Sequence, residues 1–162
     1  MSNAPTDPKR ELLRHAVATL AYRAGKALRN APPAFADFQG AEGLRTPAKI
    51  LAHMGDLFAW ATSIAQGKEA WSNATPAPWD QEVARFFGLL KNFDDYLASP
   101  EPLHAPVEKL IQGPVADALT HTGQLAMLRR MASSPVKGEN YSVAEIAAGR
   151  VGADQASPKR EF

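Results

Sequence analysis

The sequence predicts an all-α protein: a four-helix bundle with a long crossover between helices one and two, plus a short C-terminal helix. Four long segments carry apolar residues at three- and four-residue spacings, and stretches with proline or glycine separate them. No segment shows the apolar–polar alternation that is typical of a strand. The 162 residues, 45% of them hydrophobic, suffice for one core. We therefore expect one domain over residues 1–151 and a disordered tail over residues 152–162.

The first helix is predicted between Lys9 and Leu28. Its apolar face comprises Leu12, Leu13, Val17, Leu20, Ala21, Ala24 and Leu28. Residues 30–45 are rich in proline, alanine and glycine. At roughly 3.3 Å per residue, about 15 residues can run the length of a 20-residue helix. This connection is therefore the expected crossover, and it predicts a second helix that lies parallel to the first.

The second and third helices have recognisable ends. Thr46 is a predicted N-cap, with Pro47 at the first helical position, and the second helix is expected to end near Gln66. The third helix is expected to begin near Asp80 and to end before Ser99, which precedes a proline.

The fourth helix is predicted from Pro114 to about Ala132, because proline suits a first helical turn and disfavours continuation of the preceding one. A separate short turn over residues 106–112 comes before it. After a break that contains Pro135, residues 142–148 form the expected short C-terminal helix, packed across one end of the bundle.

Three residues of this arrangement can bind a metal ion. Asp117 and His121 lie four residues apart, which stacks a carboxylate and an imidazole on one helix face. A third ligand has to come from another helix, and His53 is the histidine of the second helix. Two imidazoles and one carboxylate leave coordination positions open for water or substrate, as in catalytic Zn, Ni, Mn or Fe sites. An exposed Asp/His pair at this spacing is also common on solvated helix faces.

Three neighbours of these residues are candidates for the surrounding pocket. Asp56 is predicted to orient His53 or a bound water, or to act as a base; its alternative is an exposed helix carboxylate. Gln124 continues the face of the fourth helix and is expected to border the pocket, with a surface hydrogen bond as the alternative. Trp60 lies two turns beyond His53 and can wall the cavity or pack in the core.

Composition excludes several classes of function. The 18 basic and 17 acidic side chains leave a formal charge of +1, which argues against nucleic-acid binding. No apolar stretch approaches the length of a membrane span, and the polar first residues lack a secretory signal, so we expect a cytoplasmic protein. The chain has no cysteine, so nitrogen and oxygen atoms must bind the metal, and a thiol would have to come from another molecule.

Two segments resemble the DinB-like superfamily, which is named for DNA-damage-inducible members. They are residues 46–57, TPAKILAHMGDL, and residues 113–130, GPVADALTHTGQLAMLRR. The family pattern has one metal histidine in the second helix and an H-x-x-x-H pair in the last, followed after one residue by Gly-Gln-Leu. His53 and His121 match it, whereas Asp117 stands where the family has histidine. A carboxylate there favours harder ions such as Mn(II) or Fe(II), while Zn and Ni remain suitable.

The resemblance implies a four-helix bundle with a long crossover, often a homodimer, and a metal open to solvent. Some members are similar to transferases or isomerases that use a low-molecular-weight thiol such as mycothiol or bacillithiol. We therefore expect a metal-dependent enzyme, a thiol-dependent transferase or a hydrolase, that acts on a small molecule. The alternative is a non-catalytic metal- or small-molecule-binding stress-response protein. A nucleic-acid partner is suggested only by the family's name, and the near-zero charge opposes it.

Overall fold

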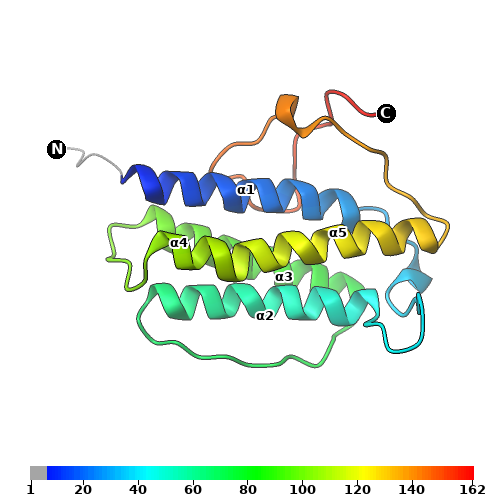
Figure 1. Cartoon of the computed structure of the whole chain (residues 1–162), viewed down its shortest axis with the longest axis horizontal. Coiled ribbons are helices and arrows are strands. Elements are labelled where there is room, and N and C mark those ends of the chain that lie inside the picture. Colours follow the sequence, from blue (N-terminus) through cyan, green and yellow to red (C-terminus); the bar gives the residue numbers. More distant parts are fainter. Residues whose placement is uncertain (1–6) are drawn as a thin grey trace.

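The computed structural model describes residues 7–162 and is helical, with one isolated β-bridge among these residues (Figure 1). Residues 1–6 of the expected domain lie outside this range. The long helices are α1 (Pro8–Leu28), α2 (Pro47–Ala65), α3 (Trp79–Ala98) and α5 (Ala116–Met131). They form the predicted all-α bundle.

The predicted helix starts are confirmed by their caps. The Asp7 side chain accepts a hydrogen bond from the Lys9 amide at 3.0 Å, and the Thr46 hydroxyl accepts one from the Lys49 amide at 3.4 Å. In both helices proline occupies the first turn, where its missing N–H would have no helical partner. Local sequence therefore determines where α1 and α2 begin.

Helix α5 does not begin at Pro114 as predicted. One helical segment runs from α4 (Val107–Leu110) through a π-helical turn (Ile111–Val115) into α5. The wider π turn accommodates Pro114, whose ring clashes with a carbonyl of the preceding turn in a regular α-helix. Proline therefore causes a local bulge here instead of a helix break.

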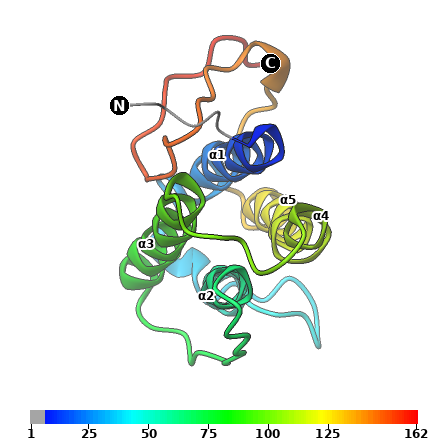
Figure 2. The same cartoon turned by 90° about the vertical axis from the view of Figure 1, so that its left-hand side faces the viewer.

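The direction of the helices corrects the expected crossover. The start of α1 contacts the end of α3, because Arg10 Nε donates to the Leu97 carbonyl at 2.6 Å, so these helices are antiparallel. Helix α2 lies diagonally opposite α1 and also runs antiparallel to it (Figures 1 and 2). The connection that runs along the bundle is residues 66–78, between the parallel helices α2 and α3 (Figure 1).

The connection between α1 and α2 stays at one end of the bundle because it folds back on itself. It contains a 3-10 turn, Pro33–Phe35, and the Ala48 amide donates to the Ala36 carbonyl at 3.0 Å. The Phe35 side chain is 1% exposed and packs edge-on against Trp79 at the start of α3. A buried anchor thus shortens a stretch that has enough residues to span the bundle.

Helices α2 and α3 share the largest aromatic cluster of the core. The Phe58 ring of α2 lies 6.2 Å from the Phe86 ring and 5.8 Å from the Phe93 ring of α3, and all three side chains are fully buried. Such pairs stabilise a core beyond the area they bury. This cluster lies behind the α2 face that carries the candidate site.

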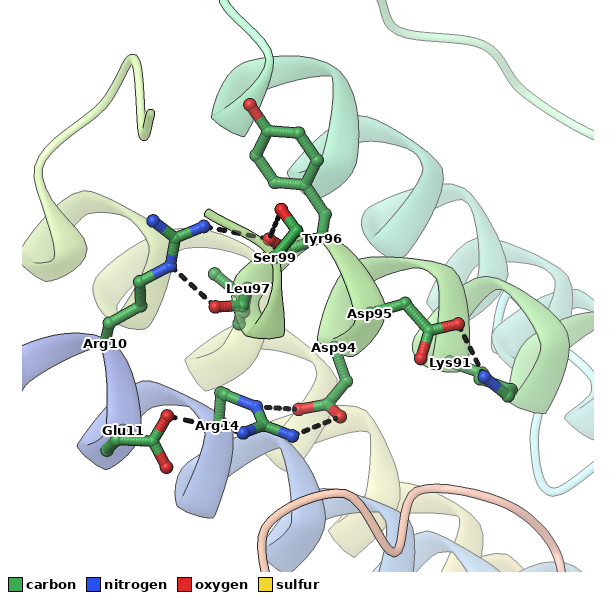
Figure 3. A network of polar contacts seen from close by, with 9 residues as sticks. All are labelled: Arg10, Glu11, Arg14, Lys91, Asp94, Asp95, Tyr96, Leu97 and Ser99. Atoms are coloured by element: carbon green, nitrogen blue, oxygen red, sulfur yellow. Dashed lines mark hydrogen bonds and ion pairs between the residues drawn. The ribbon is translucent and has the colours of Figure 1, made fainter. Parts of the chain in front are cut away.

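A polar network fixes α1 to α3 at the other side of the bundle (Figure 3). Arg14 binds the buried Asp94 carboxylate through two bonds of 3.0 and 3.1 Å. Arg10 satisfies backbone carbonyls at the end of α3, where the helix itself leaves carbonyls without amide partners.

Among residues 7–162, no helix has both the length and the apolarity that crossing a membrane requires.

The expected short helix over residues 142–148 is reduced to one 3-10 turn, Tyr141–Val143. The Asn140 side chain accepts from the Ser142 amide at 3.1 Å, which favours a turn, and Gly149 has φ of 90°. Seven residues also give too few helical hydrogen bonds to offset the cost of helix nucleation.

The expected disordered tail, residues 152–162, packs along α1 (Figure 1). Lys26 of α1 binds Glu161 at 2.8 Å and the buried Glu139 at 2.7 Å. Glu139 also accepts a hydrogen bond from the Tyr22 hydroxyl at 2.6 Å. The tail is therefore held by an ion pair with α1 and by the backbone bridge between Glu161 and Glu139, neither of which its polar composition reveals.

Candidate metal centre

The three predicted ligands converge where α2 faces α5. His53 Nε2 lies 3.4 Å from one carboxylate oxygen of Asp117, and His121 Nε2 lies 3.5 Å from the other. One donor atom from each residue lies within 4.8 Å of the other two. Helices α2 and α5 are neighbours that run antiparallel, which brings residues far apart in the sequence together (Figures 1 and 2).

The distances between His53, Asp117 and His121 are longer than those of hydrogen bonds and leave the donor atoms available to a metal ion. Ligand atoms about 2.0–2.1 Å from a tetrahedral zinc lie about 3.4 Å from one another. An N–H···O hydrogen bond is typically shorter, at about 2.7–3.2 Å. The observed distances of 3.4 and 3.5 Å exceed this hydrogen-bond range but involve different oxygens of Asp117; with one oxygen of Asp117, the three donor atoms lie within 4.8 Å of one another. The donor set of two imidazoles and one carboxylate therefore fits one divalent ion.

The site is open on the Asp117 side. The side chains of His121 and His53 are 12% and 21% exposed, whereas that of Asp117 is 46% exposed. A groove of about 470 Å³ adjoins Asp117. It is lined by Leu57, Trp60, Gln112, Gly113, Ala116, Asp117 and Thr120. Water or a small molecule can thus approach the carboxylate from solvent.

Gln124 contacts the site directly. Its Oε1 lies 2.7 Å from His121 Nδ1. Since an amide oxygen accepts, this contact selects the tautomer in which Nδ1 carries the proton, and Nε2 keeps its lone pair toward Asp117. A hydrogen bond of this kind fixes the ring orientation of metal-binding histidines.

Two tryptophans wall the site on the His53 side. The Trp71 ring packs edge-on against the His53 ring at 5.7 Å, and the Trp60 ring packs against Trp71 at 5.8 Å. Trp60 Nε1 donates to Glu69 at 3.1 Å. Trp60 is a predicted pocket residue, whereas the sequence pattern predicts no role for Trp71 and Glu69, which lie in the 66–78 connection. The sequence signal for Trp71 is a tryptophan within a polar connection, and the structure leaves it half-exposed.

Asp56 does not join the site, which corrects the expected role as a base or as a partner of His53. Its side chain is 3% exposed and forms an ion pair with Arg85 of α3. Its other oxygen accepts from the Ala74 amide at 3.0 Å. Both oxygens are thus engaged in holding α3 and the 66–78 connection against α2. The sequence places Asp56 three residues from His53, but burial directs it toward α3.

Comparisons of the chain with protein-family models, with curated proteins and with solved structures find no match. The likeness to the DinB-like superfamily therefore stays a prediction that rests on two sequence segments. What the protein does has to be argued from the geometry of His53, Asp117 and His121.

Proposed function

We propose that the protein binds one divalent transition metal through His53, Asp117 and His121 and is a metal-dependent enzyme that acts on a small molecule. The observation that carries this proposal is the convergence of three donor atoms within 4.8 Å from two different helices. The DinB-like resemblance of the same residues supports it. That resemblance also favours a thiol-dependent transferase, with a hydrolase as the second reaction class.

A divalent metal in such a site lowers the pKa of a bound water or thiol and polarises a substrate oxygen. The residues of this chain provide the conditions for that chemistry. Gln124 orients His121, and Trp71 shields His53 from one side. Asp117 leaves its side of the site open to solvent. Because the chain has no cysteine, a thiol would be a second small molecule that enters by this open side.

The types of donor atom in the site influence which metal ion it prefers. Two imidazole nitrogens suit Zn, Ni, Mn and Fe alike, and the Asp117 carboxylate adds preference for the harder Mn(II) and Fe(II). No thiolate is available to favour softer ions. The metal is therefore to be identified by elemental analysis and not from the ligand set alone.

A non-catalytic metal- or small-molecule-binding protein, of the kind expected in a stress response, is the second candidate. One observation favours it: the buried ion pair with Arg85 engages Asp56, so the site lacks the base expected there. By family resemblance we also propose a homodimer, and from the composition and the charge of +1 a cytoplasmic protein with no nucleic-acid or membrane partner. Analytical ultracentrifugation tests whether the protein is a dimer. Filter binding at low salt tests whether it binds nucleic acid.

The test of the metal site is elemental analysis of protein purified without chelator or metal-affinity tag. We expect about one equivalent of metal per chain, and its loss in His53→Ala, Asp117→Ala and His121→Ala. His15→Ala is the matched control, because His15 is an exposed histidine of α1 away from the site. No metal in the parent protein, even after reconstitution, would reject the proposal.

The test of catalysis is turnover by the metal-loaded protein, assayed with a panel of electrophiles and several thiols. Metal-dependent turnover that is lost in His121→Ala would reject the non-catalytic alternative. Full metal loading without turnover of any electrophile or hydrolysable ester would favour it.

A further inference from the structure

An apolar pocket of about 430 Å³ continues from the metal centre along α5. It begins at His121 and Gln124, which also form or contact the centre. Its lining residues are Gly43, Leu44, Arg45, Ile50, His121, Gln124, Met127, Leu128 and Met131. A volume of this size is typical of small-molecule sites, which bury most of the ligand.

The pocket is elongated. Its α5 residues run from His121 to Met131, and ten residues of α-helix rise about 15 Å. Ile50 and Leu128 are buried and form its floor. Met127 and Met131 are exposed and lie at its rim, together with Leu44. Methionine side chains are flexible and adapt to apolar ligands of different shape, so this wall can close over a chain-like molecule.

The two ends of the pocket differ in charge. Arg45 is the one lining residue with a permanent charge; its side chain is exposed, and no hydrogen bond or ion pair within residues 7–162 engages its guanidinium. It directly precedes Thr46 at the start of α2, and α2 runs antiparallel to α5, so Arg45 lies at the end remote from His121 (Figure 1). The opposite end has the metal ligands and the Gln124 amide group.

We propose that this pocket binds a linear, mainly apolar carboxylate whose carboxylate pairs with Arg45 and whose other end reaches the metal centre. The proposal names the substrate class of the proposed enzyme and so rests on the proposed function. Arg45 supplies a planar pair of donors that matches a carboxylate. The apolar walls between the two ends select against polar molecules of the same length.

Straight-chain alkanoates from butanoate to decanoate test the pocket in metal-free protein by isothermal titration calorimetry. Affinity should rise up to about fourfold per methylene until the pocket is full. Arg45→Gln should weaken binding of every member about five- to tenfold, since a charge-assisted hydrogen bond is lost. Lys49→Gln is the matched control: it removes one positive charge from an exposed residue in the first turn of α2, four residues from Arg45, and should leave affinity unchanged.

Met127→Gln tests the apolar wall. It should weaken decanoate about three- to tenfold while butanoate changes little, because Met127 lies between the Arg45 end of the pocket and His121, where only the longer chain reaches it. Leu12→Gln makes a comparable change at another exposed apolar residue, on α1, and should have no effect. Equal affinities across the alkanoate series would overturn the proposal. Equal effects of Met127→Gln and Leu12→Gln on the affinity for decanoate would also overturn it.

Cobalt-loaded protein separates this proposal from that of the metal site. With ω-mercaptoalkanoates, a thiolate-to-cobalt absorption band should appear only for chains long enough to span from Arg45 to His121. Chain-length-dependent binding without cobalt uptake would support the pocket and reject the metal site. Cobalt uptake without chain-length dependence would reject the pocket. The protein could instead bind no alkanoate and form a dimer that Met131→Gln dissociates. That result would also reject the pocket and assign its apolar surface to contact with a second copy of the chain.

Discussion

Asp56 and Asp117 provide a paired test of the site, because the structure gives the two carboxylates opposite surroundings. Asp56 is buried against Arg85 and the Ala74 amide, whereas Asp117 is half-exposed beside two histidines. We expect Asp56→Asn to lower stability and leave metal affinity unchanged. We expect Asp117→Asn to lower metal affinity and leave stability nearly unchanged.

The size of the first effect follows from the contacts of Asp56. Removing one partner of a buried ion pair costs about 3–5 kcal/mol. Arg85 keeps 29% of its side chain exposed and can regain water, and asparagine can still accept from Ala74, so we expect a smaller loss of about 2–3 kcal/mol. For a chain of this length, Tm falls by about 2–4 °C per kcal/mol, which gives about 4–12 °C for Asp56→Asn.

Thermal unfolding by circular dichroism and metal titration with a competing chelator measure the two effects. Asp117→Asn should weaken metal binding at least about 100-fold, since a ligand is altered and not merely its partner. Its Tm without metal should stay within about 2 °C of the parent, as is usual for an exposed helix residue. The reasoning fails if Asp56→Asn loses metal at unchanged Tm, because Asp56 would then act at the site.

Four further predictions concern single residues. Gln124→Leu should weaken metal binding about 10- to 100-fold, because His121 loses the acceptor that fixes its ring; an unchanged chelator titration would contradict this. A Cβ at Gly55 would lie 2.6 Å from the guanidinium that pairs with Asp56, so Gly55→Ala should destabilise by about 1–3 kcal/mol in urea unfolding. Gly88→Ala meets no neighbour within 4 Å and should stabilise by about 0.5–1 kcal/mol. The hydrogen bond from Lys26 lowers the pKa of Glu161 below its usual 4.5, so the tail contact contributes stability above pH 4.5 and loses it as pH falls through the lowered pKa. A carboxyl NMR titration with its midpoint at or above 4.5 would refute that.

The sequence predicts the helices well because their signals are local. Thr46 followed by Pro47 marks the start of α2, and the structure confirms both the cap and the boundary. The direction of α2 depends instead on non-local packing. Residues 29–46 are numerous enough to cross the bundle, but the burial of Phe35 against Trp79 and the Ala48–Ala36 hydrogen bond hold them at one end. Residue spacing does not contain that information.

The candidate site shows the same division. His53, Asp117 and His121 are residue types with metal chemistry at helical positions, so the pattern selects them, and the structure brings them together. Asp56 has the same chemistry and a plausible spacing from His53, but Arg85 comes from a helix whose register the sequence does not fix. Trp71 reaches the site because the 66–78 connection runs along α2, which depends on the same unpredicted topology.

The continuous helix that contains Asp117 strengthens the case for a metal ligand. Had α5 begun at Pro114, Asp117 would lie in a first helical turn, where a carboxylate is favourable because it faces unpaired amides and the helix dipole. That would explain the residue without a metal. Instead, α4 and the π turn precede α5, and Val115 already has helical angles, so amides of the preceding turns have helical partners. With the capping role removed, the described contacts of the Asp117 side chain are those to His53 and His121, and binding a shared ion is the role that its position supports.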